Sequence, residues 1–198
     1  MTDRQNSREE RTLDAGALRA LAHPLRVRLY DILSQYGPQT ASSLAELTGE
    51  STGSTSYHLR ALAREDLIRE VADRGTARER WWERPSGSVT LTNPEMENTP
   101  SGRAVLEAVH SETLTLRHQQ LMHFATHGWD ESPEWREASI ISTATARLTA
   151  EQAHELVQRI QSVIDETVER YRGQSGEGVR PVTLRADIFP LPTERGSA

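Results

Sequence analysis

Hydrogen-bonding side chains are concentrated in one short stretch of this 198-residue chain, residues 51–60, which reads STGSTSYHLR. Hydroxyl groups donate and accept hydrogen bonds, and a guanidinium can pair with a phosphate or with the edge of a guanine base. The first turn of a helix also presents backbone N–H groups and a partial positive charge to an anion. These properties favour contact with a nucleic acid, and the predicted contacts are Ser51, Thr52, Ser54, Thr55, Ser56, Tyr57, His58 and Arg60.

The apolar spacing around this stretch predicts the helices that must position it. A first helix is expected over about 13–22, and Pro24 suits the first position of the next, which ends at Gly37. Thr40 is a suitable N-cap for a short third helix, and Gly49 a suitable left-handed exit from it. The fourth helix, over 51–65, carries the hydroxyl-rich stretch, and its leucines are expected to pack inward.

Two strands are predicted after the fourth helix, one from residue 67 and one over 77–83, joined by a turn at 73–76. Helices followed by such a hairpin predict a winged helix-turn-helix domain over residues 12–84. The adjacent Trp81 and Trp82 fall on opposite faces of the second strand, so we expect one of them to be in the core.

The remainder of the chain is predicted to hold a linker over 85–101 and a C-terminal region over 102–190, which begins with a long helix at 102–126. Apolar residues alternate over 140–148 and 182–188, and an amphipathic helix spans 150–172 between them. This order predicts a small β-α-β unit, and the fold class is therefore α+β. Because two strands alone make a poor sheet, further strands must come from elsewhere in the chain or from a second subunit.

Four stretches of the N-terminal half, LAHPLRVRLYDIL, SLAELTG, GSTSYHLRALAREDLI and RGTARERWW, resemble the ArsR-type winged-helix transcriptional regulators. The resemblance covers about residues 13–84 and is closest to the branch with an extended C-terminal region. It implies a homodimer that binds double-stranded DNA and by default represses transcription until a small-molecule effector releases it, with activation of transcription as the alternative. The chain departs from the family at Asp66, where a glycine is usual; Asp can adopt the left-handed conformation at some cost.

The resemblance also implies a second contact through the wing, by Arg74, Thr76, Arg78 and Arg80. Alternate residues of a strand share one face, so the arginines can point together toward a minor groove or its phosphates. The alternative is a solvated hairpin in which these arginines pair with Glu79 and Glu83.

The net charge of −6 is unevenly distributed. Residues 11–84 hold 11 Arg and 10 acidic residues, whereas residues 85–198 hold 10 Arg and 16 acidic residues. The predicted DNA-binding domain is therefore nearly neutral, and a neutral domain can bind DNA when its arginines share one face. The acidic balance leaves open a second reading, in which the winged helix binds a protein and never touches DNA.

Several other function classes find no support in the sequence. The chain has no Cys, which removes thiolate metal sites, disulfides and cysteine nucleophiles. His123 and His127 are one helical turn apart, a spacing that can chelate a metal ion, and Asp130 and Glu131 are near in sequence. Two histidines without a carboxylate or thiolate in register are a weak signal, so solvated or packing histidines are favoured and we expect no metal and no cofactor. No Gly-rich phosphate loop or HExxH or GxSxG motif is present, which argues against an enzyme.

No apolar run of about 18 residues predicts a membrane span, and the polar first residues do not resemble a secretory signal. The expected localisation is therefore the cytoplasm. The sequence as a whole predicts a sequence-specific DNA-binding transcriptional regulator, dimeric and acting as a repressor, with a small-molecule effector as a further candidate partner of residues 102–190.

Overall fold

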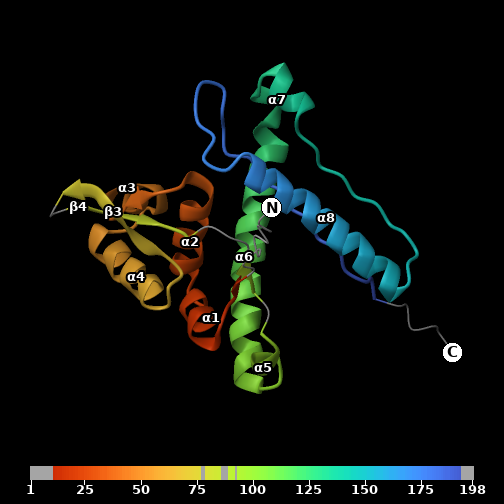
Figure 1. The fold of residues 1–198 in the computed structure, drawn as a ribbon, viewed down its shortest axis with the longest axis horizontal. Coiled ribbons are helices and arrows are strands. Elements are labelled where there is room, and N and C mark those ends of the chain that lie inside the picture. Colours follow the sequence, from red (N-terminus) through yellow and green to blue (C-terminus); the bar gives the residue numbers. More distant parts are fainter. Residues whose placement is uncertain (1–10, 77–78, 86–88, 92, 193–198) are drawn as a thin grey trace, which may run out of the picture. The chain divides into compact units, whose positions relative to one another are not determined.

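The computed structural model of the chain describes residues 11–76, 79–85, 89–91 and 93–192. It divides into two compact units, Met1–Ser139 and Ile140–Ala198. The first unit contains the predicted helix-turn-helix and the second contains the amphipathic C-terminal helix (Figure 1).

The first four helices begin at or close to the positions that the sequence predicts. In each case a side chain just before the helix accepts a hydrogen bond from a backbone N–H of the first turn, which would otherwise lack a partner. The capping residues are Asp14, His23, Thr40 and Ser51, and the helices are α1 (Ala15–Leu21), α2 (Pro24–Tyr36), α3 (Ala41–Thr48) and α4 (Thr52–Arg64).

Two left-handed residues turn the chain at the ends of α3 and α4. Gly49 follows α3 with a φ of 75°, as predicted, and its N–H bonds to the carbonyl of Ala45. Asp66 follows α4 with a φ of 52° and is the one non-glycine residue with positive φ among the described residues. The aspartate therefore takes the conformation for which glycine is the usual residue, and the chain still turns into the strand that follows.

The wing is a three-stranded antiparallel sheet in the order β2-β4-β3, formed by β2 (Gln39–Thr40), β4 (Glu79–Glu83) and β3 (Arg69–Thr76). The register shifts between Glu70 and Gly75, so the two long strands pair irregularly near the turn. Trp82 is only 7% exposed and joins the hydrophobic core, whereas Trp81 on the other face is partly exposed. The sequence-based expectation for this pair is confirmed.

The long helix α6 (Pro100–His127) belongs to the first unit. Its buried Leu106 and Val109 lie in the same core as the residues of α1 and α2, and it contacts both helices. The predicted linker is also structured: β5 (Val89–Thr90) pairs in parallel with β1 (Arg11–Thr12), and α5 (Pro94–Glu97) buries Met96. The unit boundary therefore lies after Ser139, beyond the short α7 (Pro133–Glu137), and not near residue 101.

The second unit contains α8 (Ala150–Arg170), capped by Thr149 and Gln152 as a reciprocal pair. The predicted strands on either side of it are not formed: residues 140–149 and 179–192 are irregular. The predicted β-α-β unit is therefore wrong for the single chain. Two separate strands without a neighbouring sheet gain too little from each other to form a ladder, which is the physical reason for the difference.

Gly102 is required by the close approach of α5 to the start of α6. A Cβ at this position would lie impossibly close to the backbone of Met96, which cannot move aside like a flexible side chain. We therefore expect Gly102→Ala to lower the free energy of unfolding by about 1–3 kcal/mol through overpacking. Urea denaturation measures the change, and Gly53→Ala, where a Cβ meets almost nothing, is the control.

Candidate nucleic-acid interface

The outer face of α4 is polar and exposed. Thr52, Tyr57 and Arg60 are exposed, and the side chain of Tyr57 is 64% accessible to solvent. Gly53 lies between them and leaves the backbone open, since a Cβ there would have only the Ser51 hydroxyl within 4 Å. The first turn of α4 contains no acidic residue. This face can therefore approach an anionic, hydrogen-bonding surface closely.

Thr55 does not belong to this face. It is fully buried, and its hydroxyl has no hydrogen-bond partner among the described residues. Thr55, Leu59 and Leu62 are separated by four and three residues, so they form one helical stripe, and all three are buried. The spacing alone could have shown this, and Thr55 is removed from the predicted contact surface.

His58 lies at the edge of α4, against α2. Its ring centroid is 4.4 Å from that of His23, whose Nδ1 accepts the hydrogen bond that caps α2. The Nδ1 of His58 and the Nε of Arg26 are both buried without a partner among the described residues. Burial lowers the pKa of His58, and the nearby His23 and Arg26 lower it further, while Glu50 acts in the opposite direction. The folded protein therefore favours the neutral form of His58 at the α2–α4 junction, where its ring is only partly available to a partner.

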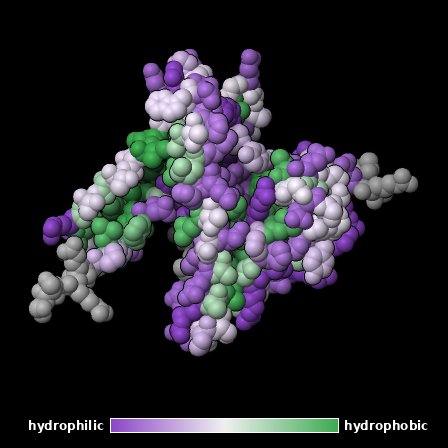
Figure 2. Space-filling model, turned by 180° about the vertical axis from the view of Figure 1, so that it is seen from behind, coloured by the Kyte–Doolittle hydropathy of each residue, from purple (hydrophilic) through white to green (hydrophobic). Residues whose placement is uncertain are grey.

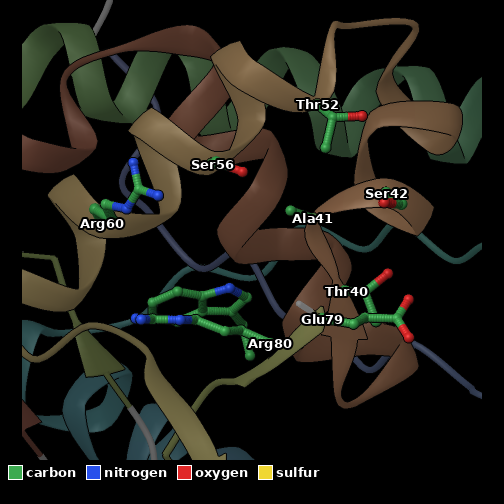
Figure 3. A pocket seen from close by; sticks show the side chains of 9 residues that line it. Thr40, Ala41, Ser42, Thr52, Ser56, Arg60, Glu79 and Arg80 are labelled. Carbon is green, nitrogen blue, oxygen red and sulfur yellow. The ribbon is translucent and has the colours of Figure 1, made fainter. Parts of the chain in front are cut away.

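A pocket of about 160 Å³ lies between the start of α3, the outer face of α4 and strand β4 (Figure 3). Helix α4 contributes Thr52, Ser56 and Arg60. The pocket thus combines hydroxyls with two guanidinium groups, and its remaining lining residues are Thr40, Ala41, Ser42, Glu79, Arg80 and Trp82. Such a combination suits a phosphate oxygen, which accepts hydrogen bonds from both groups.

The sequence did not single out Ser42. The structure brings it to the pocket beside Thr52 because α3 and α4 pack against each other. Its position in the first turn of α3, two residues after the Thr40 cap, was the available signal, since the first turn of a helix favours anions.

The wing residues are divided between exposed and paired positions. The guanidinium of Arg74 lies 3.8 Å from the ring centroid of Trp81, and Arg80 forms an ion pair of 3.3 Å with Glu70. The alternative reading of the sequence pairs the wing arginines with Glu79 or Glu83. In the structure, the ion pair of Arg80 is formed with Glu70 instead. The side chain of Thr76 and the whole of Arg78 lie outside the described residues.

The last two of the four histidines in α6 stack on each other. The ring centroids of His123 and His127 are 4.5 Å apart, and Nδ1 of His127 lies 3.0 Å from the carbonyl oxygen of His123. Among the residues that the structure describes, no group of three or more His, Cys, Asp or Glu is arranged to hold a metal ion. None of the described helices combines the length and apolar character needed to cross a membrane.

Comparison with known proteins supports the assignment of this part of the chain. Residues 21–71 match the family model of a helix-turn-helix domain. The match begins at the last residue of α1 and ends within β3, so it includes α2, α3 and α4 but not the wing strand β4. A search of curated proteins found no match to the chain. The chain therefore contains a helix-turn-helix domain, and its exposed second helix is α4.

The lowered pKa of His58 predicts how stability changes with pH. Because the folded protein favours the neutral ring, the unfolded chain binds more protons below the usual pKa of 6.5, and stability falls as pH drops through that value. Between pH 7.5 and pH 5.5, the urea midpoint should therefore fall less in His58→Gln than in the unmodified chain. The exposed His154 provides the control, since His154→Gln should leave the shift unchanged. An equal shift in all three proteins would contradict this assignment.

Proposed function

We propose that the chain is a homodimeric, ArsR-type transcriptional regulator that binds DNA sequence-specifically through α4 and represses transcription by occupying its operator. The observation that carries the proposal is the outer face of α4, which is exposed, free of acids in its first turn and continuous with the pocket formed with α3 and β4. In helix-turn-helix proteins the second helix enters the major groove, while neighbouring elements hold the DNA backbone.

The roles of individual residues follow from their places on this surface. Arg60 projects from α4 and can reach a base edge or a phosphate, whereas Ser42 lies on another helix and is suited to the backbone. Arg80 is paired with Glu70, but both side chains are largely exposed, and such a pair contributes little to stability. A DNA phosphate can therefore compete for Arg80 at small cost.

The acidic net charge does not oppose this function, because it lies mainly outside the domain. Residues 85–139 hold 3 Arg and 8 acidic residues, whereas the residues of the winged helix are nearly balanced. Charges more than about 10 Å apart in solution are largely screened at moderate salt. Local contacts at α4 and the pocket are thus the relevant electrostatic interactions.

A dimer would place two copies of α4 in successive major grooves, about 34 Å apart along one face of the duplex. The apolar face of α1 is buried within the first unit, so it is not available as a dimer contact. The second half of α6 keeps Leu121 and Met122 partly exposed, at 44% and 48%. A small-molecule effector bound by residues 102–190 remains a prediction of the sequence.

The proposal is tested by selecting bound sequences from a pool of random DNA duplexes with the full-length chain and then titrating the enriched duplex and a scrambled one. We expect an enriched site with two similar half-sites about 10 base pairs apart, and an affinity that falls steeply with salt. No enrichment and no salt dependence would contradict the proposal and would favour the protein-binding alternative.

Within the same titrations, Arg60→Ala should weaken binding to the enriched duplex by about 1–3 kcal/mol if the guanidinium reads a base. Binding to the scrambled duplex should then change little. An equal loss on both duplexes would make Arg60 a phosphate contact only. The control is Arg136→Ala, an exposed arginine on α7, which should bind both duplexes as the unmodified chain does. Loss of folding would show that Arg60 has a structural role instead.

A further inference from the structure

The arginines described in the wing strands β3 and β4 differ in what they contact. Two of them form ion pairs with glutamates, Arg69 with Glu83 at 2.7 Å and Arg80 with Glu70 at 3.3 Å. Arg74 instead lies over the ring of Trp81, with its guanidinium carbon 3.8 Å from the ring centroid. Among the described residues, Arg74 has no acidic partner. Its positive charge is therefore not neutralised within the wing.

The irregular register of the two long strands produces this contact. If the pairing of Glu70 with Trp82 continued regularly, Val71 would lie opposite Trp81. Between the two regular parts of the pair, five steps along β3 correspond to two steps along β4, so β3 holds three extra residues. In the register that follows, Arg74 lies opposite Trp81. Strand irregularities of this kind redirect a side chain, and here they bring a guanidinium onto an aromatic ring.

Trp81 has no role in the hydrophobic core. It is only partly buried, on the face of β4 opposite to the buried Trp82, and it is neither in the core nor among the partly buried apolar residues packed against the core. Figure 2 shows a mainly hydrophilic surface around the wing, at the right of the view. The ring of Trp81 is therefore available to hold Arg74 at a polar surface.

The contact with the ring leaves Arg74 able to bind an anion. A cation–π contact is an attraction to the face of the ring and uses no hydrogen-bond acceptor, so the N–H groups that point away from the ring remain available. A long arginine side chain also loses much rotational freedom when it binds a partner, and a side chain that is already held loses less. The ring thus prepares the guanidinium for binding.

We propose that Trp81 is a positioning residue of the wing, which holds Arg74 ready to bind a phosphate of the DNA backbone. A guanidinium held against the ring does not extend far from the strand, which favours a phosphate over a base edge inside a groove. A phosphate accepts charge-assisted hydrogen bonds from a guanidinium without any preference for sequence. This role rests on the DNA binding proposed above and adds a residue that acts through Arg74.

The role of Arg74 is tested by titrating the enriched duplex and the scrambled one over a range of salt concentrations. Arg74→Gln removes one positive charge, so we expect both duplexes to bind more weakly by a similar factor. The slope of log affinity against log salt concentration should become shallower by about 0.9, which corresponds to one phosphate contact. An unchanged slope, or a loss on the enriched duplex alone, would overturn the phosphate contact.

The role of Trp81 is tested by changing its ring while Arg74 keeps its charge. Trp81→Leu should weaken binding to both duplexes by about two- to fivefold, the range of an exposed cation–π contact, with an unchanged salt slope. Trp81→Phe keeps an aromatic face and should bind more tightly than Trp81→Leu. The matched control is Trp129→Leu, at a tryptophan outside the wing that is 77% exposed, and it should bind as the unmodified chain does.

A double variant separates positioning from a merely structural role. In the Arg74→Gln chain, Trp81→Leu should cause no further loss of affinity, because the side chain that the ring holds is already changed. Additive losses would overturn the proposal, and so would Trp81→Phe binding as weakly as Trp81→Leu, or loss of folding in Trp81→Leu. If the parent chain binds DNA, these outcomes overturn the role of Trp81 alone. A parent chain that binds neither duplex would overturn the proposed function and this role with it.

Discussion

The burial of one side of α4 is the constraint on which the rest of the structure depends. Thr55, Leu59 and Leu62 are fully buried, and α4 contacts α1, α2 and α3. Fixing this stripe in the core also fixes the orientation of the opposite face, where Thr52, Tyr57 and Arg60 are exposed. The exposed face is therefore held rigidly by apolar packing that is itself buried and takes no part in recognising a partner. Removing apolar contacts of this kind costs several kcal/mol, whereas exposed polar residues can vary freely.

Local signals in the sequence were sufficient to predict the helix-turn-helix. The N-caps Thr40 and Ser51 and the left-handed Gly49 are each explained by residues close in sequence, and the structure has all three. Asp66 is also left-handed although it is not glycine. Such features depend on backbone hydrogen bonds within a few residues, which is why sequence reasoning can identify them.

Features that depend on distant contacts were predicted less well. The long helix α6 was assigned to a C-terminal region, but Leu106 and Val109 are buried with α1 and α2, a contact that spacing along α6 does not reveal. Ser42 and Ser56 meet in one pocket only because two helices pack together. The alternation over 140–148 and 182–188 was read as strands, which the single chain does not form. A strand pattern predicts which face of a strand a residue occupies, but it does not identify the neighbouring strand with which that strand would pair.

In the proposed function, α4 and the pocket beside it form the surface that binds DNA. The most direct measurement is the exchange of backbone amide hydrogens in the full-length chain, with and without a bound duplex. If this surface binds DNA, the duplex should slow exchange in the first turns of α3 and α4 and in β4, with no change in α8. Protection confined to α8, or no protection in α4, would contradict it.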